Sequence, residues 1–302
     1  MAIYEPTPIA SITFKSNSNT AGSVPSEFDA ALYKPKDNAP LKLTIQLRIK
    51  LNKASPRFLP FTRDFDGNAF MTSPWTDADW QTFVRGASAQ ADIWNDQFWL
   101  VPPNTFSDFD RTFPTFPGQA FRPNIRCELA VDFNANNPHK TISVYNLNLD
   151  MLRLSGQAQN PGTFRSDAIV YDSLDATPWQ FPWGNGPDQP AKHYVIAHEI
   201  GHALGLDHIG VILKTPLCQL AAANPFGFAK YDPAAAGGNN SLYCYGWKQG
   251  AAVSGNIMGA GDQFTDRNAA PWIWAMYSIR PKLYETWRVT TTDPGPGFWV
   301  RT

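Results

Sequence analysis

The segment AHEIGHALGLDHIG, residues 197–210, constrains the fold more than any other part of the chain. It holds three of the five histidines, with Glu199 between the first two. At about 100° per residue of helix, His198 and His202 lie about 40° apart on one face, one turn from each other. The apolar residues of the same helix fall on nearly the opposite face. One side can therefore pack on a sheet while the other offers two imidazoles to a cleft.

A glycine after this helix allows a third imidazole to join. We expect the helix to cover residues 192–204 and Gly205 to adopt the left-handed conformation that ends a helix. The chain then turns sharply and brings His208 back toward the first two histidines. Three neutral imidazoles with one open position form a catalytic zinc site, whereas a structural site is usually closed by a fourth protein ligand. A chance match to the full pattern is on the order of one in a million at the chain's own residue frequencies.

Such a zinc site implies hydrolytic chemistry. Zinc lowers the pKa of its bound water toward neutrality. Glu199 can accept the proton of that water and pass it to a leaving amine, first as general base and then as general acid. The metal also stabilises the oxyanion of a tetrahedral intermediate. The residues therefore predict peptide hydrolysis, with His198, His202 and His208 as zinc ligands.

Strand patterns dominate the chain before this segment. Residues 41–51 alternate apolar and polar without a break and indicate a strand with one buried face. Three further segments indicate strands, at residues 127–133, 141–149 and 167–174. Cys127 points to the apolar side of its strand and is interpreted as a buried core thiol. In 141–149 the apolar parity slips, which predicts a bulge or an irregular edge.

Two further helices are indicated, and together with the strands they predict an α+β protein. Apolar residues recur at helical spacing after Thr76, which is a suitable N-cap, so we expect an amphipathic helix over 76–95. Pro271 near the start of residues 270–279 favours a second helix there. The order of elements favours two lobes with a cleft between them.

Composition and charge exclude several function classes. The formal net charge is −1, so nothing electrostatic suggests a nucleic acid or an anionic membrane as partner. No apolar run reaches the roughly 18 residues that a membrane span needs. The first residues lack the basic start and apolar stretch of a standard secretory signal. We nevertheless expect a secreted, extracellular monomer that acts on a protein or peptide substrate.

The run from His198 to His208 matches the H-E-x-x-H-x-x-G-x-x-H signature of the metzincin zinc metallopeptidases, and its wording, HEIGHALGLDH, resembles the matrixins within that clan. The resemblance implies a methionine in a tight turn beneath the zinc, and Met258 in SGNIMGAG fits that place. It also implies that an extended peptide binds beside the edge strand of the sheet. We expect residues 141–154 to supply that edge.

The resemblance further implies one metallopeptidase domain over residues 1–302. An upper subdomain, 1–205, would contain a twisted mixed sheet with the zinc helix. A lower subdomain, 206–302, would contain an insertion at 209–253, the Met-turn and a C-terminal helix. Within the insertion, Cys218 and Cys244 can form a disulfide. The insertion either shapes the substrate cleft or is a plain surface loop.

Other features depart from the matrixin pattern and leave the subfamily open. The histidine-rich loop that binds a second zinc in matrixins is missing, and His139 and His193 are isolated. The helical angle places His193 away from His198, so we interpret it as a surface or packing residue. Ala260 stands where some metzincins carry a tyrosine near the zinc. Calcium is possible at Asp64 in DFDGNAF, but the full calcium-loop spacing is missing and a solvated turn is the alternative.

Three function hypotheses remain. The first is a zinc endopeptidase with Glu199 as general base. The second is a catalytically silent protein that recognises a protein or a glycan on the same scaffold, although an intact Glu199 argues against a retired site. The third is a toxin or effector whose protease activity targets one host protein. It differs from the first only in substrate and delivery.

Overall fold

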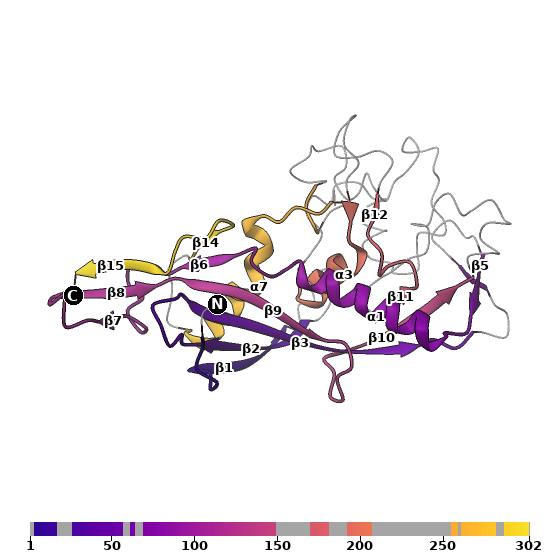
Figure 1. Cartoon of the computed structure of the whole chain (residues 1–302), viewed down its shortest axis with the longest axis horizontal. Helices are drawn as coiled ribbons and strands as arrows, with labels where there is room; N and C mark the ends of the chain where they lie inside the picture. Colours follow the sequence, from indigo (N-terminus) through magenta and orange to yellow (C-terminus); the bar gives the residue numbers. More distant parts are fainter. Residues whose placement is uncertain are drawn as a thin grey trace.

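The computed structural model describes residues 3–16, 26–56, 61–63, 69–148, 170–180, 192–206, 255–258, 261–281 and 287–301. These residues form an α+β structure with a large twisted mixed sheet and few helices (Figure 1). The α+β class expected from the sequence is therefore confirmed. The strands are β1 (Ala10–Ser16), β2 (Ser26–Tyr33), β3 (Leu41–Lys53), β4 (Phe61–Arg63), β5 (Ala69–Ser73), β6 (Trp99–Val101), β7 (Arg111–Thr112), β8 (Gln119–Pro123), β9 (Ile125–Asp132), β10 (Lys140–Leu147), β11 (Val170–Asp172), β12 (Trp179–Gln180), β13 (Lys192–His193), β14 (Arg288–Thr290) and β15 (Gly297–Arg301). The helices are α1 (Asp77–Asp92), α3 (Val195–Ala203), α7 (Ala270–Ile279) and a 3-10 turn, η5 (Asp266–Ala269).

Strand β3 is the centre of the large sheet. Its six odd-numbered apolar residues, from Leu41 to Leu51, are all buried, so the alternation predicts its buried face correctly. Burying each such side chain contributes roughly 1.5–3 kcal/mol. Along one edge β3 pairs in parallel with β9, and along the other it pairs first with antiparallel β2 and then with parallel β10.

Strand β10 lies inside the sheet and is not an edge. It pairs with β3 through Lys140–Val144 and with β11, in parallel, through Ser143–Tyr145, and at Asn146 and Leu147 it pairs in antiparallel with β5. The expectation that residues 141–154 form a substrate-binding edge is therefore wrong for the described part of that range. Leu147 is buried like Val144, and the slip in apolar parity coincides with the change of partner strand.

Helices α1 and α3 lie side by side over one face of the sheet (Figure 1). Helix α1 starts as predicted, because the Thr76 hydroxyl accepts a hydrogen bond from the Asp79 N–H at 3.1 Å. Helix α7 has a proline in its first turn, also as predicted. Its Trp272 packs near Trp94 and Phe98 in one continuous core that contains buried residues from both proposed subdomains. Cys127 lies in the same core, fully buried, as its strand pattern predicted.

Helix α3 starts three residues later than the predicted range. Lys192 and His193 belong to β13 and pair with Trp179 and Gln180 of β12. A strand partner from elsewhere in the chain thus overrides the helical pattern in those two residues. A separate sheet of β15, β8 and β7 extends to one end of the molecule, at the left of Figure 1. Within the described ranges, no helix combines the length and the apolar character that a membrane crossing requires.

Candidate metal centre

Helix α3 is held in place by a buried glutamine of α1. Tyr194, at the N-cap position, offers no side-chain hydrogen bond to the first turn. Instead, Gln90 Oε1 accepts from the backbone N–H of Ile196 at 2.9 Å and from that of Ala197 at 3.4 Å. Gln90 Nε2 donates to the carbonyl of Asp175 at 2.6 Å. A tertiary contact therefore caps the helix that carries the histidines, and it ties this helix to α1.

The two described histidines of the motif converge on one point. His198 Nε2 and His202 Nε2 lie 3.1 Å apart. Two nitrogen ligands of a tetrahedral zinc ion, each roughly 2.0–2.1 Å from the metal, are separated by about 3.3 Å. The spacing of the two imidazoles therefore fits a shared metal ion.

Each imidazole is oriented by a backbone carbonyl. His198 Nδ1 lies 2.7 Å from the carbonyl oxygen of Ile257, and His202 Nδ1 lies 2.8 Å from that of Leu206. A carbonyl oxygen can only accept, so Nδ1 carries the hydrogen in both rings. In the neutral ring Nε2 is then the nitrogen without a hydrogen, and this tautomer can bind a metal through Nε2.

The surroundings keep His198 neutral. Burial, and to a smaller extent the nearby His202, lower the pKa of His198 to about 3, against the raising effect of the Ile257 hydrogen bond. When both Nε2 atoms lack a hydrogen, their lone pairs repel each other at 3.1 Å. A cation between them removes that repulsion, so the chemistry of this pair suits a metal ion.

The turn after α3 has the geometry that the sequence predicts. Gly205 has a φ of +92°, in the left-handed region. Its N–H bonds to the carbonyl of His202, and the N–H of Leu206 bonds to that of Gly201, both at 2.9 Å. These are the two bonds of a Schellman motif. The motif turns the Leu206 carbonyl toward the His202 ring, so Gly205 also helps to orient that ring.

Met258 lies directly against α3. It is fully buried in the turn at residues 255–258. Gly201 faces it, and a Cβ at this glycine would overlap Met258 Sδ and lie 3.0 Å from its Cε. Because Gly201 has no side chain, the Met258 thioether can approach the backbone of α3.

Glu199 is also buried, with 7 % of its surface exposed. Lys140 of β10 lies within electrostatic reach of this carboxylate. Burial lowers the pKa of Lys140, and the negative charge of Glu199 acts in the opposite direction. Nothing in the sequence indicated Lys140, because it precedes a strand segment that is far from the motif along the chain.

Two isolated histidines have different environments. His193 does not lie on the helix, and the angle estimated from a helix is wrong because the residue belongs to β13. Its ring centre is 5.6 Å from that of His198, and burial lowers its pKa to about 3, so of the two interpretations, surface or packing residue, the packing residue fits. His139 lies away from the motif, and its Nδ1 accepts from the backbone N–H of Arg48 at 3.0 Å.

Several expected site residues lie outside the described residues. They are His208, Ala260, Asp64, and Cys218 and Cys244 of the 209–253 insertion. Among the residues that the structure does describe, no three His, Cys, Asp or Glu side chains gather as a metal site. Only His198 and His202 of the expected ligand set lie in the described residues, and all three ligands stay a prediction.

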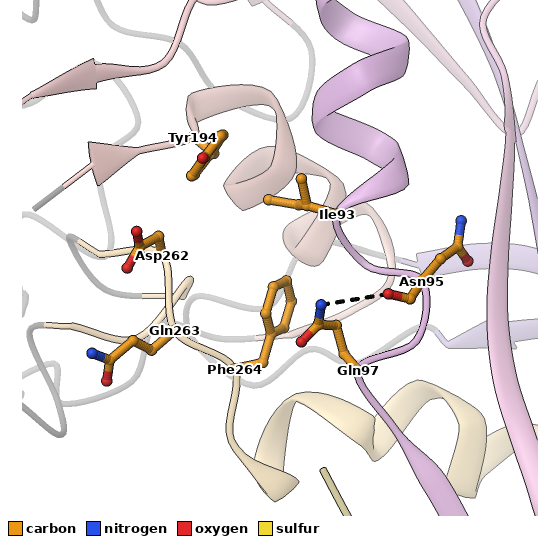
Figure 2. A pocket seen from close by; sticks show the side chains of 7 residues that line it. All are labelled: Ile93, Asn95, Gln97, Tyr194, Asp262, Gln263 and Phe264. Carbon is orange, nitrogen blue, oxygen red and sulfur yellow. Dashed lines mark hydrogen bonds between the residues drawn. The ribbon is translucent and has the colours of Figure 1, made fainter. Parts of the chain in front are cut away.

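A cleft of about 590 Å³ adjoins α1, α3 and the turn that contains Met258. It is lined by the end of α1, by Tyr194 just before α3, and by the segment that follows Met258. Figure 2 shows Asp262 and Gln263 on one side of this cleft, with Phe264 beside Ile93. The cleft therefore combines an apolar surface with a carboxylate.

Comparisons of the chain with protein-family models, curated proteins and solved structures found no match.

Proposed function

We propose that the protein is a zinc-dependent endopeptidase of the metzincin type. The observation that carries the proposal is the approach of His198 Nε2 and His202 Nε2 to 3.1 Å, with both rings fixed by carbonyl bonds to their Nδ1 atoms. Structural packing of the two rings alone does not require that both Nε2 atoms approach one point. His208 would complete the ligand set after the turn at Gly205.

When bound, zinc would supply an acidified water and a positive charge that stabilises a developing oxyanion. Glu199 follows His198 on α3, in a buried environment where a carboxylate interacts strongly with nearby charges. It would take the proton from the attacking water and transfer it to the amine of the departing peptide. His198 and His202 would stay neutral and keep their Nδ1 hydrogens on the carbonyls throughout.

The cleft beside Tyr194 is the best candidate for binding a substrate side chain. Its lining residues are close in sequence to the expected site: Tyr194 is four residues before His198, and Asp262 is four residues after Met258. Asp262 favours a basic group on the substrate, and Phe264 with Ile93 favours an aliphatic stem. A lysine or arginine side chain combines both properties.

Two measurements test the proposal. Metal analysis of the purified chain should find one zinc per molecule, and a peptide library derived from a proteome should be cleaved. Glu199→Gln should keep the zinc and lose cleavage by a factor of about 10² or more, because the proton acceptor is gone. Glu128→Gln is the matched control, since Glu128 is a half-buried carboxylate of β9 that forms an ion pair with Lys42.

The outcomes separate the hypotheses. Full activity of Glu199→Gln would contradict the mechanism, and equal losses in Glu199→Gln and Glu128→Gln would indicate a structural effect. A chain that holds one zinc but cleaves no peptide would instead support the silent binding protein. A chain that binds no zinc would refute the metal centre altogether.

A further inference from the structure

A pair of buried asparagines lies behind the carbonyl that orients His198. Asn256 and Asn268 are each 1 % exposed. Their side-chain amides bond to each other in both directions: Asn256 Nδ2 donates to Asn268 Oδ1 at 2.9 Å, and Asn268 Nδ2 donates to Asn256 Oδ1 at 3.1 Å. Such a reciprocal pair fixes both side chains, because a rotation of either one breaks two bonds.

The same two amides hold the backbone on both sides of the Met258 turn. Asn256 Oδ1 also accepts from the N–H of Met258 at 2.8 Å. Asn268 Oδ1 also accepts from the N–H of Thr265 at 2.8 Å, and Asn256 Nδ2 reaches the Thr265 hydroxyl at 3.1 Å. The amide pair thus connects the turn to the first residues of η5.

Ile257 lies between the two ends of this connection. Asn256 precedes it and Met258 follows it, and the side chain of the first bonds to the backbone of the second. The N–H of Ile257 bonds to the carbonyl of Gln263 at 2.7 Å. With both neighbours and its own N–H fixed, the Ile257 carbonyl has one direction available, which is toward His198 Nδ1 at 2.7 Å.

We propose that Asn256 and Asn268 are positioning residues of the metal centre, which fix the Ile257 carbonyl and through it the ring of His198. This inference rests on the proposed function, because it assigns to the amide pair the orientation of a zinc ligand. The pair touches neither substrate nor metal. Partners behind metal-binding histidines typically change metal affinity 10- to 100-fold when they are removed.

The test uses the full chain, freed of metal by a chelator and reloaded with zinc or cobalt(II). Asn268→Asp keeps the size of the side chain and its Oδ1 acceptor but removes the amide that donates to Asn256. We expect zinc to bind about tenfold more weakly in competition with a chelator of known affinity. We also expect the visible absorption bands of bound cobalt(II) to shift, because they report the arrangement of the ligands.

A matched control comes from another buried asparagine. Asn124 is 2 % exposed, and its Nδ2 donates to the carbonyl of Gly295 at 2.9 Å, in the region where β8 meets β9. Asn124→Asp removes the same kind of bond away from the histidines. It should lower the melting temperature but leave zinc affinity and the cobalt spectrum unchanged.

A milder pair of variants covers the case in which Asn268→Asp does not fold. Thr265→Val removes the hydroxyl that accepts from Asn256, and Thr265→Ser keeps it. The valine variant should shift the cobalt bands in the same direction as Asn268→Asp, and the serine variant should match the unaltered chain.

The inference is overturned if Asn268→Asp or Thr265→Val folds and keeps the zinc affinity and cobalt bands of the unaltered chain. It is also overturned if Asn124→Asp weakens zinc binding as much as Asn268→Asp does. Failure of the unaltered chain to bind either metal would refute the proposed function itself. That outcome is distinct, because the other two require a metal-loaded reference.

Discussion

Replacing Gly201 by alanine tests the contact between α3 and Met258. An alanine inside a helix normally stabilises it by about 0.5–1 kcal/mol relative to glycine. Here the new Cβ would overlap Met258 Sδ and lie 3.2 Å from Cζ2 of Trp94. Overpacking of a tight core typically costs about 1–3 kcal/mol. Because the clash outweighs the helix propensity, we expect a net destabilisation of roughly 1–2 kcal/mol.

A double-mutant cycle identifies the source of that loss. Met258→Ala alone leaves a cavity and should cost about 2–5 kcal/mol. In the double variant, the methyl group of the new alanine at Gly201 occupies part of the space vacated by the thioether. The two losses should therefore fall short of additivity by about 0.5–3 kcal/mol. Urea unfolding of the four proteins, with zinc removed, measures this coupling.

Whether Gly201→Ala raises or lowers the stability of the chain decides whether Met258 lies against α3. Ser88→Ala, on the exposed face of α1, is the control for helix propensity and should change stability little. If Gly201→Ala proves as stable as the unaltered chain or more stable, the thioether does not lie against α3. Strict additivity in the cycle leads to the same conclusion.

Three further predictions concern other residues. Gln90→Leu removes the partner of two N–H groups and of a carbonyl, and it should destabilise the chain by roughly 2–4 kcal/mol in urea unfolding. Gln90→Glu keeps the acceptor and should recover part of this loss. Equal losses in the two variants would contradict the capping role. Asp262→Asn should reduce cleavage at basic residues by about three- to fivefold in a peptide library, since a part-exposed ion pair contributes ~1 kcal/mol or less, whereas Asp266→Asn, outside the cleft, should not. Burial and then Arg48 lower the pKa of His139, so the unfolded chain takes up a proton first as pH falls below about 6.5. The stability that His139 contributes is then lost, and urea unfolding of His139→Gln should show a weaker decline between pH 7 and 5; parallel curves would refute this.

Local patterns predicted the elements whose signals are contained in their own residues. The alternation in β3, the cap at Thr76 and the proline in α7 all lie within the elements that they define. The left-handed Gly205 belongs to the same class, because a glycine after a helical pattern has few other uses.

The predictions failed where a distant partner decides the structure. Lys192 and His193 fit a helical pattern but pair with β12, and β10 is internal because β11 pairs with it on the side opposite β3. Neither pairing can be predicted from the residues of the segment itself. The motif likewise predicts that two imidazoles share a face, but a backbone carbonyl such as that of Ile257 has no sequence signature.

The buried amides show the same limit for polar side chains. Asn256 and Asn268 are twelve positions apart, and only the folded turn brings them together. Gln90 looks like any polar residue of an amphipathic helix until α3 is placed against it. Side chains that support a site through a second residue can therefore be recognised only in the folded structure.

Main-chain carbonyl oxygens, rather than side chains, orient the rings of His198 and His202 so that their Nε2 atoms lie close together. The residues at positions 257 and 206 contribute a peptide group that every amino acid possesses. Their side chains can thus be exchanged among residues of similar size without disturbing the histidines. Because both side chains are buried, positions 257 and 206 should tolerate apolar residues of similar size, whereas Gly205 and Asn256, whose chemistry shapes the loops, should tolerate few substitutions.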